Sequence, residues 1–491
     1  MMLEPDTCYR AAKAHDPRFD GRFFIGVSST GIYCRPICTV KMPKRENCTF
    51  FPSAAAAESE GYRPCLRCRP ELAPGNASVD SSHRIAQAAA SLIEDGTLSE
   101  NSLDTLAARL GVTDRHLRRV FQGEFGVCPV AFAQTQRLLL AKRLLTDTDS
   151  ALTDIAFASG FGSLRRFNAL FKDRYRLSPK QLRKTPRPAA APDTLTFELS
   201  FRPPYDWASM LAFLRARCVT GVEEVGDASY RRIVRIAHGG EQHVGWLEVA
   251  MSPKKPALRI LISASLMKVL PAVLARIKHL MDLSANPSEI AETLGDLAAR
   301  NPGLRVPGAF DGFEIAVRAI LGQQITVAAA RTLASRFAKA FGCPVESPFP
   351  ALSIAFPSPE RIAQLSLNDV ASLGVIASRA RAIIQMAGLI TERDLSLTPG
   401  VNVDSTLQKL RSIPGVGEWT VQYLAMRTLA WPDAFLHTDL IVMRALAEKN
   451  PRRVLARSEA WRPWRAYAVM HLWAAEKSRR AKLETANGTV Y

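Results

Sequence analysis

The spacing of apolar and polar residues divides the C-terminal half of the chain into an early part with strands and a later helical part. Apolar residues at alternate positions predict four strands, at Leu195–Phe201, Arg232–Ile236, Val244–Ala250 and Leu258–Ile262. Apolar residues three and four positions apart predict helices at Trp207–Arg217 and Leu266–Leu283, and from about Phe310 the pattern is mostly helical. This order predicts an α+β domain followed by an all-α domain.

Residues 83–183 have a helical pattern that repeats imperfectly, about 50 residues apart. The first copy contains Leu103–Gly111, the second contains Asp154–Phe161, and a helix over Arg137–Leu145 would join them. In each copy a glycine turn is followed by a helix rich in basic residues, among them Arg115, Arg118, Arg119, Arg165 and Arg166.

A helix, a tight turn and a basic second helix are typical of the helix-turn-helix, whose second helix enters the DNA major groove. The five arginines are therefore predicted to contact DNA. Two such units in tandem resemble the AraC-type DNA-binding domain, which implies a transcription regulator with RNA polymerase as a further partner. A plain helical bundle with a solvated basic face is the alternative.

The stretch Ile413-Pro-Gly-Val-Gly417 predicts a tight turn directly before a helix that carries Val421 and Leu424. Free N–H groups and the helix dipole at such a helix start favour a phosphate. Asp439 opens the next predicted helix, 22 residues after Gly417. The alternative is a capping turn followed by an ordinary N-cap, with Thr438 as its rival.

This arrangement resembles the helix-hairpin-helix DNA glycosylases, in which a glycine-rich hairpin grips a DNA strand and an Asp ends the following loop. The resemblance implies strand contacts through Gly415 and Gly417. Members that also cut the strand carry a Lys two residues after the second Gly, and here that position is Trp419. No amine for a Schiff base is present there, so the sequence favours a monofunctional, base-removing reaction.

Three phrases, RPPYDWASMLAFLRAR, PGLRVPGAFDGFEIAVRAILGQQITVAAA and RPWRAYAVMHLW, resemble the 3-methyladenine DNA glycosylase II (AlkA) type over nearly all of residues 194–477. The resemblance implies that Asp439 is the catalytic carboxylate. It also implies a base pocket walled by Phe213, Trp419, Tyr423 and Trp473. Core packing is the alternative role for each of these aromatic residues.

Two positions depart from the pattern of that type. Gln324 stands where the best-known member has a leucine that fills the gap left by the flipped base, so Gln324 is predicted to contact DNA. Ala474 replaces a further tyrosine of the pocket. The lesion preference is therefore open.

Four of the nine cysteines form two close pairs near the start of the chain, Cys34-x3-Cys38 and Cys65-x2-Cys68, which are separated by 26 residues. Four thiolates at these spacings can close a tetrahedral zinc site. From the spacing alone, a purely structural zinc clip is the alternative. Because no cysteine follows Cys343, the four-cysteine iron–sulfur loop of some hairpin glycosylases is not expected.

The surrounding phrases DPRFDGRFFIGVSSTGIYCRP, KMPKREN and GYRPCLRCRPE resemble the zinc domain of the adaptive-response (Ada) regulator over roughly residues 5–75. The resemblance implies that Cys34 takes a methyl group irreversibly from a methylated DNA phosphate. Arg35, Lys44, Arg45 and Arg63 are predicted to contact phosphates, with solvated surface as their alternative role. Cys48 lies outside the two pairs and is predicted to be a buried or spare thiol.

The 64 Lys and Arg residues exceed the 46 Asp and Glu residues, which gives a formal net charge of +18 and favours a polyanionic partner. The start of the chain lacks a signal-like apolar core, and no apolar run approaches the length of a membrane span. We therefore expect a soluble, cytoplasmic protein that binds double-stranded DNA. The Pro-Cys-His-Arg nucleophile of the Ada regulator's second methyltransferase is absent, so O6-methylguanine repair is not expected.

Together these features predict a monomeric, multidomain, mainly α protein with α+β parts. Its expected domains are an α+β zinc and methyl-acceptor domain (1–77), an AraC-type double helix-turn-helix (82–184), an AlkA-type N-terminal α+β domain (194–305) and an all-α helix-hairpin-helix glycosylase domain (306–477). One alternative is a transcription regulator whose C-terminal half senses damage but is catalytically weak. The other is a glycosylase whose N-terminal modules are inert.

Overall fold

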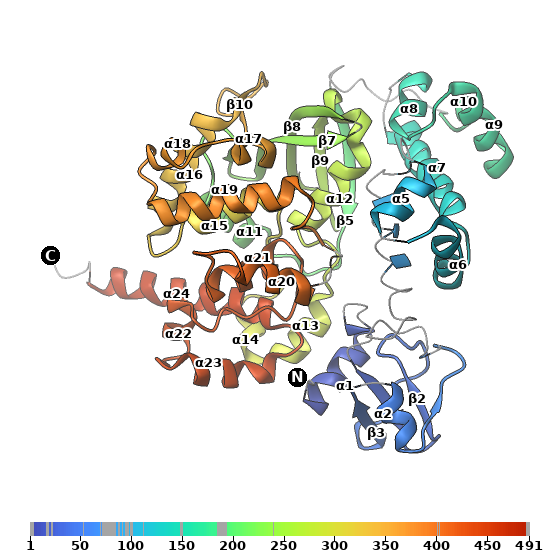
Figure 1. The fold of residues 1–491 in the computed structure, drawn as a ribbon, viewed down its shortest axis with the longest axis horizontal. Helices are drawn as coiled ribbons and strands as arrows, with labels where there is room; N and C mark the ends of the chain where they lie inside the picture. Colours follow the sequence, from blue (N-terminus) through green and yellow to red (C-terminus); the bar gives the residue numbers. More distant parts are fainter. Residues whose placement is uncertain are drawn as a thin grey trace.

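The computed structural model describes residues 4–487, apart from 16–18, 21–22, 53, 69, 71–84, 87–88, 91, 94–97, 99–101, 111, 148–150, 184–193, 239, 400 and 402. Figure 1 shows the small first module at the lower right, the helices of the second module above it, and the C-terminal half at the left as the largest body. Residues 73–78 and 185–192, which separate the predicted domains, lie outside the described residues.

The first module is a small sheet with a helix on each side. Its four strands have the order β3-β1-β2-β4, and only β2 and β4 run parallel. Its elements are α1 (Pro5–Lys13), β1 (Phe24–Val27), β2 (Ile32–Cys34), β3 (Cys48–Phe51), α2 (Ala54–Ser59) and β4 (Arg63–Pro64). The buried rings of Phe19, Phe23 and Phe50 form its core with one face of α1.

The second module is helical, as predicted from its repeat. Its main helices are α5 (Leu103–Arg109), α6 (Asp114–Phe125), α7 (Pro129–Asp147), α8 (Leu152–Ala158), α9 (Leu164–Tyr175) and α10 (Pro179–Leu182). Leu117 and Phe121 of α6 are fully buried, and so are Phe167 and Phe171, at the corresponding positions of α9. The repeat therefore reflects two similar packing units, which α7 joins.

The third module contains a five-stranded antiparallel sheet of order β5-β9-β8-β7-β6. Its elements are β5 (Thr194–Ser200), α11 (Trp207–Ala216), β6 (Glu223–Val225), β7 (Ser229–His238), β8 (Glu241–Met251), β9 (Ala257–Ser263), the 3-10 helix η4 (Ala264–Val269) and α12 (Leu270–Leu280). The four predicted strands and two predicted helices are confirmed. The three-residue strand β6 is too short to show a periodic pattern.

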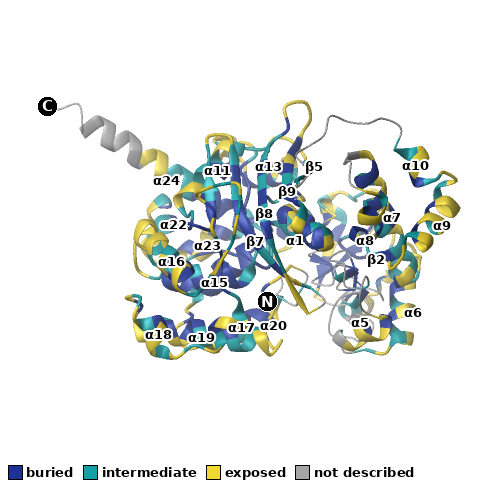
Figure 2. Cartoon of the chain, turned by 90° about the horizontal axis from the view of Figure 1, so that it is seen from above, coloured by how far each residue is buried: buried dark blue, intermediate teal, exposed yellow. Residues whose placement is uncertain are grey.

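The second and third modules share one hydrophobic cluster. Leu144, Ile155 and Phe171 of the helical repeat belong to the same buried cluster as Phe197 and Ile260 of the sheet. In addition, the guanidinium of Arg143 lies 4.9 Å from the ring centre of Phe197 and donates to the carbonyl of Glu198. The two modules are therefore packed together through buried side chains. Figure 2 colours much of the sheet of the third module dark blue, as buried.

The rest of the chain forms a helical core with a short antiparallel pair, β10 (Cys343–Pro344) and β11 (Ile354–Ala355). Its helices are α13 (Pro287–Leu294), α14 (Asp296–Ala299), α15 (Gly312–Leu321), α16 (Val327–Phe341), α17 (Pro359–Ala363), α18 (Leu367–Ala371), α19 (Ala377–Thr391), α20 (Val403–Arg411), α21 (Glu418–Arg427), α22 (Leu440–Ala445), α23 (Pro451–Arg457), η5 (Ser458–Trp461) and α24 (Arg465–Asn487). Within the described residues, none of the helices combines the length and the apolarity that a membrane span needs.

A buried ion network fastens the sheet to the helical core. Arg232 of β7 donates to Glu314 of α15 at 2.5 Å, and Arg318 of α15 donates to both Glu314 (2.8 Å) and Glu223 (3.0 Å). Tyr230 donates to the other oxygen of Glu223 at 2.6 Å. Removing one partner of such a network would leave an uncompensated buried charge, so the network holds β6 and β7 against α15.

The first module also contacts the helical core. Phe19 packs against Trp431, with ring centres 5.7 Å apart. Arg10 of α1 donates to the carbonyl of Arg462 at 3.1 Å, and Lys13 pairs with Glu292 at 2.5 Å on the rim of this contact. The contact joins residues that are more than 270 positions apart in the sequence.

Candidate functional site

The hairpin between α20 and α21 exposes its backbone. Gly415 adopts a left-handed conformation with φ +89°, which L side chains rarely adopt. Gly417 is in an extended conformation and is the N-cap of α21, with no side chain capping the helix. Gln323 supports the turn from behind by donating to the carbonyl of Gly415 at 2.9 Å and to Thr420 at 3.0 Å. The uncapped amides at the start of α21 are therefore available to an anion.

Asp439 is both a helix cap and the centre of a second set of contacts. Its Oδ1 accepts from the backbone N–H groups of Ile441 (2.9 Å) and Val442 (3.0 Å), which caps α22. The same oxygen accepts from Nε1 of Trp473 at 3.0 Å, and Oδ2 accepts from Nε1 of Trp419 at 2.8 Å. The side chain is almost fully buried, so four N–H donors fix its position.

The four aromatic residues predicted as pocket walls come together around this carboxylate. Trp419 and Tyr423, one turn apart on α21, stack with ring centres 4.9 Å apart and an interplanar angle of 11°. Phe213 of α11 faces Trp473 of α24 with ring centres 6.4 Å apart and an angle of 17°. Since each pair contains one indole bound to Asp439, the carboxylate links the two stacked pairs.

Two arginines that were not predicted from the sequence lie against these rings. The Arg427 guanidinium is 4.9 Å from the ring centre of Phe213 and 5.4 Å from that of Tyr423. The Arg217 guanidinium is 3.8 Å from the ring centre of Phe213 and 5.9 Å from that of Trp473. Each arginine follows a pocket aromatic by four positions on a helix, the spacing at which side chains on one face meet. This four-residue spacing is the feature of the sequence that points to the two arginines.

The positive charges change the acidity of the pocket phenol. Burial raises the pKa of Tyr423, but the charges of Arg427, Arg217 and Arg318, with a hydrogen bond from Arg427, outweigh burial and leave the pKa below its ordinary value. The Nη1 atom of Arg427 donates to the Tyr423 hydroxyl at 2.6 Å. The hydroxyl of Tyr423 is therefore held by Arg427, and the position of its ring beside Trp419 is fixed.

Gln324 lies at the tip of the turn between α15 and α16, where it is exposed and has φ +55°. Its neighbour Ile325 is also exposed, whereas Gln323 is bound to the hairpin. The turn and the hairpin thus lie side by side, with Gln324 facing outward from the protein. Its contact with DNA stays a prediction.

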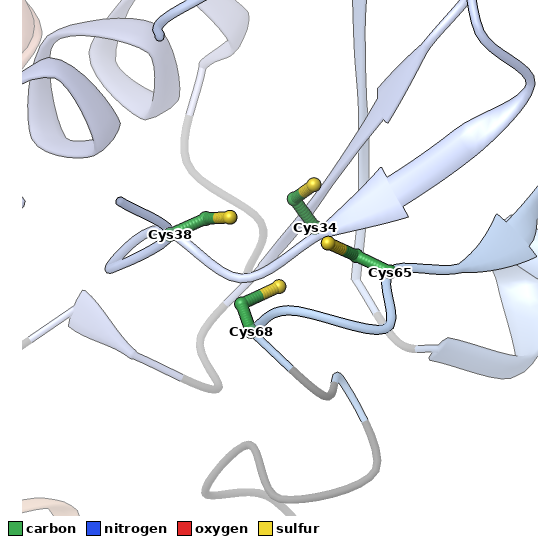
Figure 3. A group of neighbouring side chains, drawn as sticks. All are labelled: Cys34, Cys38, Cys65 and Cys68. Carbon is green, nitrogen blue, oxygen red and sulfur yellow. The ribbon is translucent and has the colours of Figure 1, made fainter. Parts of the chain in front are cut away.

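The four paired cysteines form one cluster in the first module, with their side chains pointing toward one another (Figure 3). Parallel pairing of β2 with β4 places Cys34 beside the Cys65 segment, and the N–H of Cys65 donates to the carbonyl of Tyr33 at 3.0 Å. All four sulfurs lie within 4.8 Å of one another. Sulfurs at about 2.3 Å from a tetrahedral zinc would be about 3.8 Å apart, so the cluster fits this metal after a small contraction.

The basic residues near this cluster have different environments. Arg63 is exposed, and Arg45 is half exposed while it pairs with Asp6 at 2.7 Å. Arg35 is buried, and its guanidinium binds Asp20 and the carbonyl of Cys68. The described structure therefore turns the Arg35 side chain inward, where it supports the cysteine loop. Cys48 is buried outside the cluster, as predicted, with its sulfur 3.4 Å from the carbonyl of Lys44.

The predicted DNA-reading helices present their basic side chains to solvent. Thr113 caps α6 by accepting from the N–H of His116 at 3.3 Å, and Ser163 caps α9 in the same way, from Arg166 at 3.2 Å. Five arginines are exposed on these two helices: Arg115, Arg118, Arg119, Arg165 and Arg166. Arg118 also pairs with Asp114 at 3.0 Å on its own helix.

These features define a class, a DNA repair protein in which a cysteine-cluster module and a helix-turn-helix module precede a helix-hairpin-helix core. Four family models match in the same order: the metal binding domain of Ada (residues 7–71), a helix-turn-helix domain (106–185), the AlkA N-terminal domain (196–311) and the HhH-GPD superfamily of base excision DNA repair proteins (317–462).

Relatives have the same composite organisation. The chain is 38% identical over 483 residues to a "Probable bifunctional transcriptional activator/DNA repair enzyme AlkA" of Mycobacterium tuberculosis, which covers 95% of this chain and 96% of that protein. It is 37% identical over 280 residues to DNA-3-methyladenine glycosylase 2 of Escherichia coli, with 57% of this chain and 97% of that one covered. It is also 32% identical to Escherichia coli Ada, over 37% of this chain and 49% of Ada. The chain belongs to the family of bifunctional AlkA-type transcriptional activators and DNA repair enzymes.

Proposed function

We propose that the C-terminal half is a monofunctional DNA glycosylase that removes alkylated purines by hydrolysing the N-glycosidic bond. The observation that carries this proposal is the carboxylate of Asp439, which is held by two indoles that belong to two stacked pairs of aromatic rings. A carboxylate between electron-rich ring faces suits a reaction that begins with a cationic base and develops positive charge on the sugar.

The proposed reaction starts when an alkylated base is flipped out of the duplex and stacks in the pocket. Alkylation at N3 or N7 makes the purine cationic, so it is attracted to the ring faces and leaves readily. When the bond between the sugar carbon and the purine nitrogen breaks, its electron pair goes to the base, and positive charge grows on the sugar. The ionised Asp439 would stabilise that charge and orient the water that adds to the sugar carbon. The water's surplus proton passes to solvent.

The DNA strand would be held by the backbone of the hairpin. The uncapped start of α21 and the open surroundings of Gly417 support contact with a phosphate. Gln324, exposed at the neighbouring turn, would contact the duplex where the flipped base has left. Because Trp419 occupies the position of the strand-cutting lysine, the proposed product is an intact strand with an abasic site.

For the N-terminal half, we propose a methyl acceptor that controls a transcription regulator. Zinc bound by Cys34, Cys38, Cys65 and Cys68 would keep the thiols deprotonated at neutral pH. The Cys34 sulfur would attack the methyl carbon of a methylated DNA phosphate, so that a carbon–sulfur bond forms and a carbon–oxygen bond breaks. The phosphate leaves as the ordinary diester anion.

The charge change would couple this reaction to DNA binding. Four thiolates around a divalent cation carry a formal charge of −2, and methylation of one thiolate changes this to −1. The cluster then repels DNA less, which strengthens binding by the exposed arginines of α6 and α9. We propose that the chain acts as a monomer on DNA in the cytoplasm, with RNA polymerase as a partner at the promoters it controls.

The zinc stoichiometry gives the first test of the N-terminal proposal. Metal analysis of the purified chain should find about one zinc per molecule, as a site of four thiolates requires. Cys38→Ser should lower the zinc content strongly, because it removes one ligand. Cys48→Ser is the matched control and should keep full zinc, since Cys48 lies outside the cluster. A folded chain without zinc would contradict the assignment.

The function of the whole chain is tested by incubating it with methylated duplex DNA. Released bases and the mass gain of the protein are measured in the same reaction. We expect release of 3-methyladenine together with a gain of one methyl group per chain. Methyl gain without base release would favour a regulator with a catalytically weak C-terminal half. Base release without methyl gain would favour a glycosylase with inert N-terminal modules.

A further inference from the structure

The Arg217 guanidinium lies against the ring faces of the proposed base pocket. It is 3.8 Å from the ring centre of Phe213, the distance of direct stacking, and 5.9 Å from that of Trp473. The two rings are nearly parallel with their centres 6.4 Å apart, and the guanidinium lies over Phe213, to one side of the line that joins the two centres. A guanidinium is flat and cationic, and in both respects it resembles an alkylated purine.

The two arginines beside the rings are held by different partners. Arg427 is buried and donates to the carbonyls of Pro307 and Gly308 and, at 2.6 Å, to the hydroxyl of Tyr423. Arg217 is half-buried, donates to the carbonyl of Phe213 at 3.5 Å and has a side-chain hydrogen bond with Tyr423. Arg427 is thus fixed to the segment Pro307–Gly308, whereas Arg217 can turn away if it gives up its contacts with Phe213 and Tyr423.

The backbone of Arg217 stays in place if the side chain turns away. Arg217 is the C-cap of α11, and its N–H donates to the carbonyls of Arg215 and Leu214. Its own carbonyl accepts from Arg318, which belongs to the buried ion network. A change of side-chain conformation therefore needs no movement of α11, and the guanidinium can turn toward the solvent.

We propose that Arg217 covers the part of Phe213 on which a flipped base would stack and that every flipped base must displace it. The proposal rests on the assignment of Phe213 and Trp473 to the base pocket. A flat base and the Arg217 guanidinium cannot both lie at stacking distance on the same face of Phe213, so entry of a base breaks the contact between Arg217 and Phe213. A cationic lesion replaces that contact with its own attraction to the rings. An undamaged purine is uncharged and replaces only part of it.

Displacing Arg217 costs the same free energy for every base, but this cost lowers the excision rate of only some bases. When a lesion binds strongly enough to fill the pocket, removing the cost does not change its rate of excision at saturating protein. An undamaged base fills the pocket rarely, so its rate rises in proportion when the cost is removed. Arg217 would therefore suppress the excision of undamaged purines.

The test compares guanine with 7-methylguanine, which differ by one methyl group and one positive charge. Both are placed in the same duplex sequence, and release is timed with the protein in excess over DNA. Arg217→Ala should raise guanine release by about 2- to 30-fold, the factor expected for the loss of one cation–π contact. Release of 7-methylguanine should change by less than about twofold. Arg217→Met keeps the apolar stem and should behave like Arg217→Ala even if the smaller residue weakens the fold.

Arg215→Ala is the matched control, since Arg215 is an exposed arginine of the same helix that bonds the carbonyl of Gly226 at 2.7 Å, away from the rings. It should leave both rates unchanged. If neither Arg217 variant raises guanine release, or if both slow the release of 7-methylguanine, Arg217 does not compete with the base. If the wild-type protein releases no 7-methylguanine, the pocket assignment itself is wrong, which separates the two failures.

Discussion

Asp439→Asn is expected to reduce the excision of 3-methyladenine by at least about a hundredfold while DNA affinity stays nearly the same. The substitution keeps the size of the side chain and an oxygen that can still cap α22, but it removes the negative charge opposite the developing sugar cation. Preorganised charges of this kind contribute about 3–4 kcal/mol to a transition state. The release of the base is timed with the protein in excess, and affinity is measured on an uncleavable abasic analogue.

Asp311→Asn is the matched control for this substitution. Asp311 is the N-cap of α15 and accepts from the N–H of Glu314 at 3.1 Å, so the same chemical change is made at a cap outside the pocket. The control should excise at the wild-type rate. Neither protein should cut the strand, because the position of the strand-cutting lysine is Trp419. If Asp439→Asn excises the base at a near-normal rate, Asp439 serves only as the N-cap of α22 and not as a catalytic residue.

Cys34→Ser is expected to abolish methyl transfer from methylphosphotriester DNA. A serine hydroxyl at this position is a far weaker nucleophile than a thiolate. After incubation of the wild-type protein, peptide mass spectrometry should find the added methyl on Cys34, and the variant should gain none. Cys343 is exposed and serves as an internal control for unspecific alkylation, since random methylation would reach it first. A methyl on another residue in both proteins would refute the assignment.

The methylated protein from this experiment is also used to test whether methylation of Cys34 changes DNA binding. Methylated wild-type protein should bind promoter DNA more tightly by about three- to tenfold at low salt, the effect of one charge at about 10 Å from the phosphates. The difference should shrink as salt is added, because screening shortens the range of the interaction. Equal affinities before and after methylation would leave Cys34 as a methyl acceptor without a regulatory effect.

Much of the fold could be predicted because it depends on periodic burial. The strands β5, β7, β8 and β9 alternate buried and less buried residues, and the repeated helices bury the same positions. The pair β10–β11 could not be predicted, since strands of two residues have no periodicity. The shared core of the second and third modules could not be predicted either, because each pattern shows that a face is buried but does not show against which partner.

The residues of the candidate site could be predicted where a sequence motif contains them. They could not be predicted where their role depends on the direction in which the side chain points in the folded protein. The resemblance assigned Asp439 and the four aromatic residues to one pocket, and in the structure they lie together. Arg35 follows Cys34 and is predicted from the sequence to contact a DNA phosphate. In the structure its side chain points inward, because it forms a buried ion pair with Asp20. The positions of Arg217 and Arg427 are not evident from the sequence, because a helical arginine is ordinarily solvated and only the packing of α11 against α21 and α24 brings these two to the rings.

The cluster shared by the helical repeat and the sheet has a consequence for the DNA itself. Phe171 of α9 and Ile260 of β9 belong to one buried cluster, and the buried ion network fastens the same sheet to α15. The predicted groove-reading helix and the proposed excision pocket therefore cannot separate without exposing apolar surface to water or breaking that network. A duplex held by α9 therefore has a fixed direction relative to Asp439. DNA is stiff over about 150 base pairs, so two nearby stretches of one duplex reach both places only at the cost of curvature. Which lesions lie within reach of a promoter-bound molecule thus depends on how readily the intervening sequence bends.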